Sequence, residues 1–253
     1  MLNQTFTNFE LLFIDDGSDD NSLNIVREYK DSRIRVFSDG LSLGLAKRLN
    51  QGVYEAKGKY IARMDADDVS FPTRLMKQVD FLDLYPNVDL VGCRALVFNN
   101  NLDILGLLPF KKNHDSLCER LWNNIPLPHP TWLGRRKWFE LNAYKVPDVY
   151  RAEDQELLLR AHLTSQYSCL DDVLLGYRMG AFQSKRVIRT RLSLLKMQLT
   201  HFAKHKTWIS IFNALSVTTL KIVADLVSTI FKSDKWYSNR MKKDIKRKDV
   251  EQL

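Results

Sequence analysis

Cysteine is scarce in this chain, and its first residues lack the composition of a secretion signal. The three cysteines, Cys93, Cys118 and Cys169, do not have the close spacing of a metal site, and pairing would leave one thiol over. This pattern excludes a cysteine-based metal site and suits a reducing cytoplasm. The segment Met1 to Phe6 has neither a basic start nor a long apolar run, so we expect no signal peptide.

A recognisable nucleic-acid-binding motif is also lacking, although the net charge is +8. The charge is uneven: residues 1–181 carry 22 Lys and Arg against 25 Asp and Glu, whereas residues 182–253 carry 16 against 5. We therefore divide the chain into a domain over residues 1–181 and a basic region over residues 182–253. Such asymmetry indicates an anionic partner, either nucleic acid or a membrane surface, and the missing motif favours the membrane.

Three carboxylates, Asp65, Asp67 and Asp68, directly follow a short apolar segment, Tyr60 to Met64. The segment predicts a buried strand, and ligands of open parallel α/β sheets bind at the carboxyl ends of strands. Acidic groups this close repel one another unless a cation binds them, and oxygen ligands suit Mg²⁺ or Mn²⁺. Taken alone, the acids are better explained as an acidic turn before the helix that Ser70 to Thr73 would open.

A second strand ends in the same way upstream. The apolar segment Phe9 to Ile14 is followed by Asp15, Asp16 and a Gly-Ser turn. Two strands that end in acid pairs are expected to point at one crevice.

A third acidic pair, Glu153 and Asp154, opens a predicted helix. By itself the pair is explained as favourable charge at a helix N-terminus, worth a few tenths to about 1 kcal/mol. Beside two acid-ended strands and the resemblance described next, a functional role becomes the stronger hypothesis.

The order of these pieces is more specific than any one of them. It resembles family 2 of the inverting glycosyltransferases, in particular the bacterial members that build polysaccharide. The segments with counterparts in that family are Asn3-Gln-Thr-Phe6, Asp15-Asp-Gly-Ser18, Gly44 to Asn50, Asp65-Ala-Asp-Asp68 and Ala152 to Leu157. The similarity covers roughly the first 180 residues. It implies a GT-A-type α/β fold, with a doubly wound, mostly parallel sheet and helices on both faces, and a nucleotide-diphosphate sugar, expected to be a UDP-sugar, as donor.

The resemblance also implies a strand that this sequence does not provide. Family members normally begin with a hydrophobic strand and a helix before the segment that corresponds to Asn3-Gln-Thr-Phe6, and here the chain starts after them. That strand is central in the sheet. We therefore expect two neighbouring strands with unpaired backbone groups.

Hydrophobic periodicity supports the α/β assignment. Strands are expected over residues 9–14, 33–37, 60–64, 88–98, 104–108 and 167–177, and helices over residues 18–30, 43–56, 71–84, 111–124, 186–205 and 208–231 and from residue 153. The alternation up to Asp65 indicates a parallel sheet with right-handed crossovers, and the fourth and fifth strands are expected to form a hairpin. The proline-rich segment Ile125 to Trp132 is expected to be irregular.

The resemblance assigns roles to the acids. Asp154 would be the general base that deprotonates the acceptor hydroxyl, with Glu153 as the alternative. Asp65 and Asp67 would hold the metal ion and the diphosphate or ribose of the donor, with Asp68 second in line.

Further donor contacts are expected upstream. Asp15 and Asp16 would meet the nucleobase and ribose, because carboxylates accept hydrogen bonds from N–H and O–H groups. Lys47 or Arg48 would reach the phosphates, unless both are solvated helix residues.

Several other residues invite a role that packing explains as well. His129 lies between two prolines, where a structural hydrogen bond is the commoner role. Trp132, Trp138 and Tyr144 could stack on sugar rings, but most of them are expected in the core. Asp171-Asp172 is expected on a turn or bulge, without chemistry.

The basic region contains a mostly apolar stretch of 24 residues, Trp208 to Phe231. Its length suits a membrane span, but Asn213, Lys221 and Asp225 interrupt it, and a Lys or Asp near the bilayer centre costs roughly 2.5 to 3.5 kcal/mol. We therefore expect it not to span. Its apolar residues fall on one helical side: Trp208, Ile211, Phe212, Leu215, Ile222, Leu226 and Ile230.

Lys-rich sequence follows from Lys232 to Lys248. An apolar face beside basic residues suits an anionic membrane surface, contacted through residues 186–248, and a peripheral location on the inner face of the plasma membrane. Packing against the domain and a dimer contact are the alternatives.

Two other functions remain open. A catalytically inactive nucleotide-sugar-binding remnant is favoured by the missing strand. A metal-dependent phosphoryl or nucleotidyl transferase would share acid-ended strands.

Overall fold

The computed structural model describes residues 1–147, 151–180, 183–230 and 245. All six predicted strands are present, together with two short ones, β4 and β7, that are too short for a periodicity to reveal. The strands are β1 (Leu11–Ile14), β2 (Ile34–Phe37), β3 (Tyr60–Ala62), β4 (Val69–Ser70), β5 (Leu90–Phe98), β6 (Ile104–Leu107), β7 (Leu133–Arg135) and β8 (Tyr167–Arg178).

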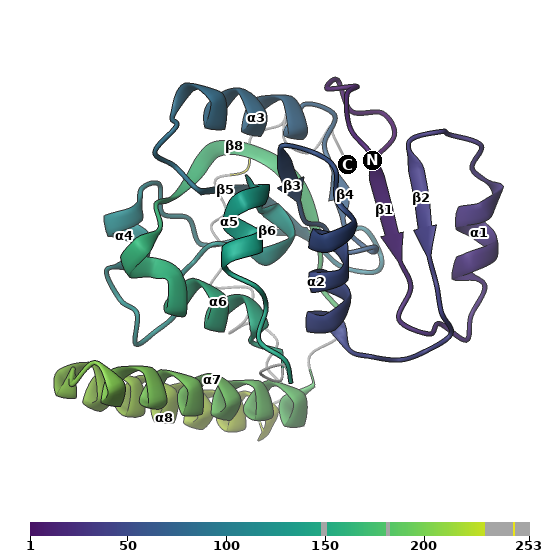
Figure 1. The fold of residues 1–253 in the computed structure, drawn as a ribbon. Helices are drawn as coiled ribbons and strands as arrows, with labels where there is room; N and C mark the ends of the chain where they lie inside the picture. The colour runs from purple at the N-terminus through teal and green to yellow at the C-terminus, as the bar shows by residue number, and fades with distance from the viewer. Residues whose placement is uncertain (148–150, 181–182, 231–244, 246–253) are drawn as a thin grey trace.

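The strands form two sheets (Figure 1). β1 and β2 pair in parallel, and the other six strands form a sheet in the order β3-β7-β5-β8-β4, with β6 paired to β5. The α/β class is as predicted, but the larger sheet is mixed rather than mostly parallel. Only β5 and β8 pair in parallel there, because β7 enters antiparallel between β3 and β5, and β4 and β6 are antiparallel to their neighbours.

β1 and β3 belong to separate sheets. Among the described residues β1 pairs only with β2, from Leu11 opposite Ile34 to Ile14 opposite Phe37, and β3 pairs only with β7. Among the described residues, β1 and β3 thus each have one edge without a partner strand, as expected. The absence of a central strand stays a prediction.

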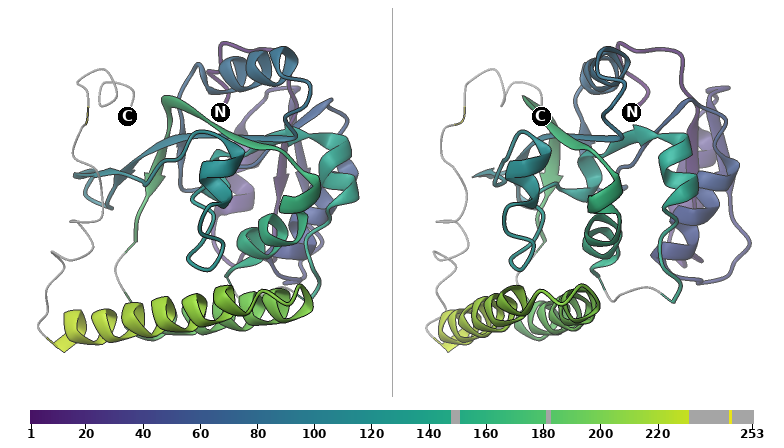
Figure 2. Two further views of the ribbon diagram at one scale, coloured as in Figure 1. Left: turned by 90° about the vertical axis from the view of Figure 1, so that its left-hand side faces the viewer. Right: turned by 60° about the vertical axis from the view of Figure 1, so that its left-hand side comes forward.

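Helices cover both faces of the larger sheet. They are α1 (Ser22–Glu28), α2 (Leu45–Glu55), α3 (Arg74–Leu84), α4 (His114–Cys118), α5 (Arg136–Leu141), α6 (Glu153–Ala161), α7 (Ser184–Lys204) and α8 (Trp208–Ile230), with the 3₁₀ turns η1 (His129–Thr131) and η2 (His162–Thr164). α3 lies on one face, and α5 and α6 lie on the other (Figure 1). α7 and α8 lie side by side beyond α6 (Figure 2).

The helix predicted over residues 111–124 is wrong in its extent, because α4 spans only His114–Cys118. Asn113 caps it, accepting a hydrogen bond from the Ser116 N–H. The carbonyl of Lys112 accepts a 2.9 Å hydrogen bond from the backbone N–H of Cys169 on β8. The sheet thus holds the residues before α4 in an extended conformation.

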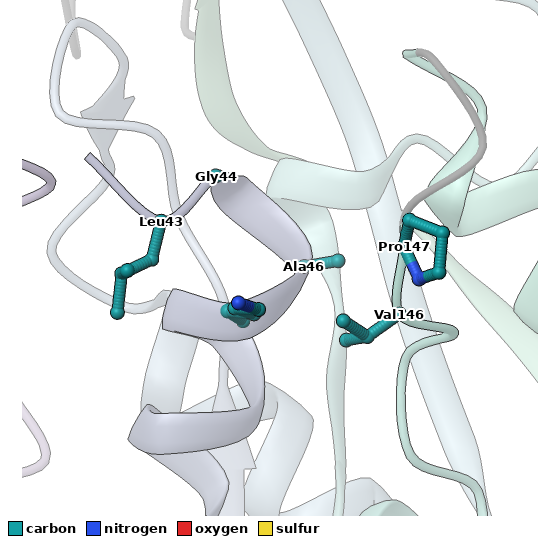
Figure 3. A pocket seen from close by; sticks show the side chains of 6 residues that line it. Leu43, Gly44, Ala46, Val146 and Pro147 are labelled. Carbon is teal, nitrogen blue, oxygen red and sulfur yellow. The ribbon is translucent and has the colours of Figure 1, made fainter.

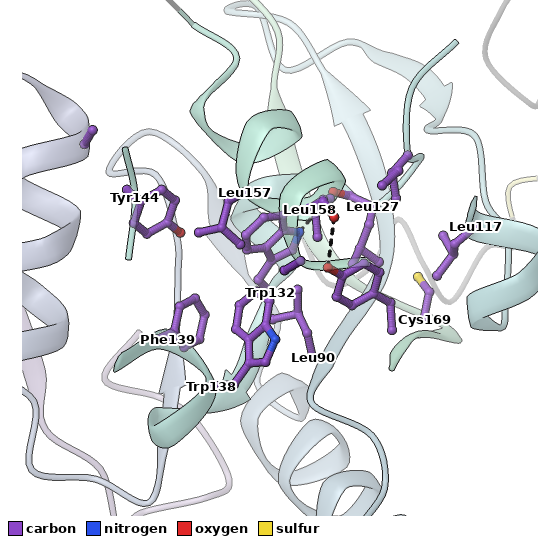
Figure 4. Packing of buried hydrophobic residues seen from close by; sticks show 14 residues of the cluster. Leu90, Leu117, Leu127, Trp132, Trp138, Phe139, Tyr144, Leu157, Leu158 and Cys169 are labelled. Carbon is purple, nitrogen blue, oxygen red and sulfur yellow. Dashed lines mark hydrogen bonds between the residues drawn. The ribbon is translucent and has the colours of Figure 1, made fainter. Parts of the chain in front are cut away.

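The core is built around β5, in which eight of nine residues are buried. On one side of it pack Trp132, Trp138 and Tyr144, whose exposed fractions are 0%, 5% and 4% (Figure 4). The expectation that most of these aromatic residues belong to the core is therefore confirmed, and here it holds for all three.

A bulge interrupts the pairing of β5 with β8. Cys93 lies opposite Leu170 and Arg94 lies opposite Val173, so that Asp171-Asp172 has no partner on β5. The predicted bulge is confirmed. Its carboxylates form exposed ion pairs with residues outside the acid-ended strands.

Candidate active site

The chain segment after β3 brings Arg63 and Asp65 together. Arg63 is 8% exposed, and its Nη1 and Nη2 atoms lie 2.8 and 2.5 Å from Oδ2 and Oδ1 of Asp65. Residues two apart along an extended segment share a face, which allows this bidentate pair. Arg63 was not predicted from the sequence, although its position two residues before Asp65 indicates this pairing.

Asp68 is turned toward β8. It is 7% exposed, and its Oδ1 accepts a 2.8 Å hydrogen bond from the Arg178 N–H, while Oδ2 is buried without a hydrogen-bond partner. Burial raises the pKa of Asp68 to about 6; the hydrogen bond from Arg178 opposes this shift, and the charges of Asp65 and Asp67 add to it. Asp67 itself is exposed.

Glu153 and Asp154 occupy the start of α6, as predicted. Glu153 is 9% exposed, and its Oε1 lies 3.7 Å from Nδ1 of His129. Asp154 is partly buried and accepts a 3.3 Å hydrogen bond from Nε2 of Gln155. Burial raises the pKa of both carboxyls. A carboxylate of raised pKa is a stronger base, as general-base catalysis requires.

His129 supports this pair from the core side. Its Nε2 shares a 2.7 Å hydrogen bond with the hydroxyl of Tyr144, and its ring stands edge-on to Trp132 at 4.5 Å between centroids. Burial, followed by the positive charge of Arg63, lowers the pKa of His129 to about 3, so the ring is neutral near pH 7. These contacts match the structural role expected for His129.

The ends of β3 and α6 form one charge cluster. The positive charge of Arg63 acts to lower the pKa of Glu153 and of His129, and the negative charge of Asp65 acts to raise both. The negative charge of Asp154 also acts to raise the pKa of His129. Coulomb interactions of this kind act beyond direct contact. The direct contacts at the two element ends are those of Arg63 with Asp65 and of Glu153 with His129.

The acids of this cluster would hold a metal ion only together with oxygen atoms of a bound substrate. Among the residues that the structure describes, no three His, Cys, Asp or Glu side chains are placed to hold an ion. Asp68, second in line for the predicted metal site, is directed to the backbone of β8, and the assignment of Asp65, Asp67 and Asp68 to a metal ion stays a prediction. Asp65 and Asp67 remain, and Mg²⁺ commonly binds through one or two carboxylates together with substrate phosphates.

Asp15 and Asp16 lie in a different network, in the turn after β1. Asp15 is 3% exposed and accepts hydrogen bonds from its own turn, including one of 3.1 Å from the Ser18 N–H, and these lower its pKa. Asp16 accepts hydrogen bonds of 2.7 Å from the Leu43 N–H and 3.0 Å from Nε of Arg48. Asp15 therefore organises the turn after β1, and Asp16 organises the approach to α2.

Arg48 is committed to the same network. It is 5% exposed and forms ion pairs of 3.0 Å with Asp16 and 2.6 Å with Asp39. Its guanidinium is thus engaged by the protein's own carboxylates rather than presented to solvent.

Lys47 instead lines a pocket of about 320 Å³ at the first turn of α2 (Figure 3). The other lining residues are Leu43, Gly44, Ala46, Val146 and Pro147. Two 2.8 Å hydrogen bonds join the Asn50 side chain to the backbone of Tyr144. This clamp, which sequence reasoning missed, connects α2 to the residue that holds His129.

Comparison with known proteins identifies the family of this chain. The model of the family Glycosyl transferase family 2 matches residues 1–141. The chain is 41% identical over 167 residues to EpsE of Bacillus subtilis, named as a glycosyltransferase, covering 63% of this chain and 58% of that protein. It is 28% identical over 224 residues to the O-antigen biosynthesis glycosyltransferase WbnJ of Escherichia coli, covering 85% of both.

A solved structure gives the same result for the fold. The crystal structure of Staphylococcus aureus TarS (residues 1–349) in complex with UDP superposes with a TM-score of 0.58 at 20% identity, covering 78% of this chain and 59% of that chain. At such low identity the likeness establishes the fold alone, which is the GT-A-type α/β fold that the sequence resemblance implies.

Proposed function

Because the chain belongs to glycosyl transferase family 2, we propose that it transfers a sugar, with inversion, from a nucleotide-diphosphate sugar to a saccharide or lipid-linked acceptor. UDP is the expected nucleotide, since TarS was crystallised with UDP. Assembly of bacterial surface polysaccharide is the expected setting, since WbnJ is named for O-antigen biosynthesis. The observation that carries the proposal is the pairing of Arg63 with Asp65 after β3, together with the acidic pair Glu153 and Asp154 at the start of α6.

In the proposed reaction Asp154 accepts the proton of the acceptor hydroxyl as that oxygen attacks the anomeric carbon, and the nucleotide diphosphate leaves from the opposite face. Burial raises the pKa of Asp154 and so strengthens it as a base. Glu153 is the alternative, but its carboxylate is the one that faces the buried ring of His129.

We propose that Asp65 and Asp67 hold Mg²⁺ or Mn²⁺, which would supply positive charge to the leaving diphosphate. Asp15 and Asp16 would contact the nucleobase and ribose, and the donor would then replace hydrogen bonds that they accept from Ser38 and Leu43. Lys47, which lines the pocket, is a better candidate than Arg48 for the donor phosphates.

The proposal predicts separate losses of chemistry and of binding. Asp154→Asn is expected to lower the transfer rate by about 10² to 10⁴ and to leave UDP affinity unchanged, because an amide cannot take the proton. Asp67→Ala is expected to abolish metal-dependent UDP binding. Calorimetric titration with UDP, with and without Mn²⁺, and a transfer assay with UDP-sugars measure the two effects.

Asp80→Asn serves as the matched control, since Asp80 is an exposed acid on α3. Unchanged turnover in Asp154→Asn would remove the base assignment. UDP binding without any sugar transfer would favour an inactive remnant, and chemistry at the phosphate with no sugar moved would favour a phosphoryl or nucleotidyl transferase.

We also propose a cytoplasmic location, on the inner face of the plasma membrane. Cys93, Cys118 and Cys169 are all free thiols, as a reducing compartment allows. The division into residues 1–181 and 182–253 likewise remains a proposal.

A further inference from the structure

The helices α7 and α8 carry a surface that the proposed reaction does not use. They run side by side along the border of the molecule beyond α6 (Figures 1 and 2). α7 is fixed to the domain of residues 1–181. Nε2 of Gln198 donates a 2.8 Å hydrogen bond to the Leu121 carbonyl, and Phe202 packs against Leu159.

The outer side of α8 is apolar. Eight apolar side chains between Trp208 and Val227 are exposed, and Thr219 is the only exposed polar one in that range. They span an arc of about 140° on a regular helix. Their members are Trp208, Ile209, Phe212, Leu215, Leu220, Val223, Leu226 and Val227. This set, called here the α8 face, differs from the predicted one, since Ile211 and Ile222 are partly buried.

The charged residues that interrupt the α8 sequence face inward. Asp225 is fully buried, and its carboxylate lies 2.5 and 3.0 Å from Nε and Nη2 of Arg191 on α7. Lys221 hydrogen-bonds through its Nζ to the side chain of Asn123. The α8 face itself therefore carries no charged residue.

The exposed residues of α7 are predominantly basic. Lys185, Arg186, Arg189, Lys196 and Lys204 are all exposed there, and the only exposed large apolar residue of α7 is Leu192. The molecule thus presents an apolar helix face beside a basic one.

We propose that the α7–α8 pair binds the surface of a bilayer that contains anionic lipid, with α8 lying in the plane of the membrane. The α8 face would enter the boundary between headgroups and acyl chains, and the basic residues of α7 would meet the acidic headgroups. An apolar surface of this extent is otherwise unfavourable in water.

The internal contacts favour an in-plane helix over a spanning one. α8 is long and apolar enough to cross a membrane by length and composition. Crossing would, however, separate Asp225 from Arg191 and place the Asp in hydrocarbon, which is strongly unfavourable. Lying flat keeps this pair and the contact of Ala214 with Leu159 and Phe202.

Charge favours lipid over a second copy of the chain. Residues 182–253 carry 16 basic against 5 acidic residues, so two such regions brought together would repel each other. Anionic headgroups instead attract each Lys or Arg by about 1 kcal/mol.

The test is co-sedimentation of the full chain with vesicles of phosphatidylcholine, with or without phosphatidylglycerol. The triple variant Ile209→Ser, Phe212→Ser, Leu220→Ser removes three members of the α8 face, which are 79%, 69% and 69% exposed. The matched control is Tyr54→Ser, Leu84→Ser, Leu141→Ser, at residues that are 86%, 70% and 74% exposed on other helices. We expect binding that requires phosphatidylglycerol, weakened about tenfold or more by the first triple and unchanged by the second.

A second set of measurements tests the contribution of the basic residues of α7 and how deeply α8 enters the bilayer. Lys185→Gln, Lys196→Gln, Lys204→Gln is expected to weaken binding about tenfold or more, and high salt or alkaline carbonate is expected to release the bound protein. Resistance to both extractions would indicate a spanning helix and overturn the in-plane arrangement. Equal binding by both serine triples, or a vesicle-independent dimer that only the first triple dissociates, would overturn the lipid proposal.

Vesicle binding is independent of the proposed reaction, because it needs neither nucleotide nor acceptor. Asp154→Asn is expected to bind vesicles as the unchanged chain does, and the α8 triple is expected to keep its UDP affinity. A failed transfer assay with intact vesicle binding would therefore count against the proposed function alone.

Discussion

At the scale of single residues, two arginines organise the candidate site. Arg63 pairs with Asp65 and acts on Glu153 and His129. Arg74 on α3 is fully buried, and its Nη2 donates a 2.7 Å hydrogen bond to the Arg63 carbonyl. α3 therefore fixes the backbone at the point where the acids begin, so that the geometry of the site depends on a helix that follows it in sequence.

Asp68 leads to a prediction about pH. Its folded-state pKa is raised from 3.8 to about 6, so its contribution to stability is fully present below pH 3.8 and is lost as the pH rises through about 6. Asp68→Asn stays neutral throughout. The variant is therefore expected to gain roughly 3 kcal/mol in unfolding free energy relative to the unchanged chain between about pH 4 and about pH 8.

Urea unfolding of both proteins across this range, in the presence of a chelator, measures the difference. The exposed Asp80→Asn change provides the baseline. A difference for Asp68→Asn that does not vary with pH would show that Asp68 titrates normally.

At the scale of elements, the close contact of β5 with the proline-rich segment sets the position of His129. η1 packs against β5, and Gly92 on β5 leaves the room for it. A Cβ at Gly92 would lie 2.6 Å from Cδ1 of Leu127 and 2.9 Å from Oγ1 of Thr131, both of which are buried. The absent side chain is thus what allows the segment to approach the sheet.

Gly92→Ala is expected to destabilise the protein by about 1–3 kcal/mol, because the buried neighbours must move. Chemical denaturation monitored by tryptophan fluorescence measures the change. Gly180→Ala is the control, since no atom lies within 4 Å of its added Cβ. Equal midpoints for the two variants would mean that Leu127 and Thr131 rearrange without cost.

At the scale of the whole molecule, the basic region shares a core with the catalytic part. Phe202 and Ala214 are 2% and 0% exposed and pack with Leu159 near the end of α6, the helix whose start carries Glu153 and Asp154. Folding of α7 and α8 is therefore expected to be coupled to that of the domain.

Phe202→Ala is expected to lower the free energy of unfolding by about 3 kcal/mol and to keep a single transition. Phe212→Ala, at a residue that is 69% exposed, is expected to have little effect. Calorimetry or urea unfolding of the full chain distinguishes the two. Two separate unfolding transitions in Phe202→Ala would mean that the basic region folds independently of the domain.

Much of the fold and the site could be predicted from local patterns. Apolar runs, helical spacing and turn residues located the six strands, and the acid-ended segments at Asp15, Asp65 and Glu153 placed the candidate residues at element ends. The order of those motifs identified the family. Such signals are carried by neighbouring residues and therefore survive without tertiary contacts.

Only the tertiary structure decided what each group meets. The insertion of β7 next to β3 made the larger sheet mixed rather than mostly parallel. The ion pairs with Asp16 and Asp39 determined the role of Arg48. Asp68 was turned to β8, and Asp225 found Arg191 across the interface of α7 and α8. These outcomes depend on contacts between residues distant in sequence, whose energies arise only when the chain is folded.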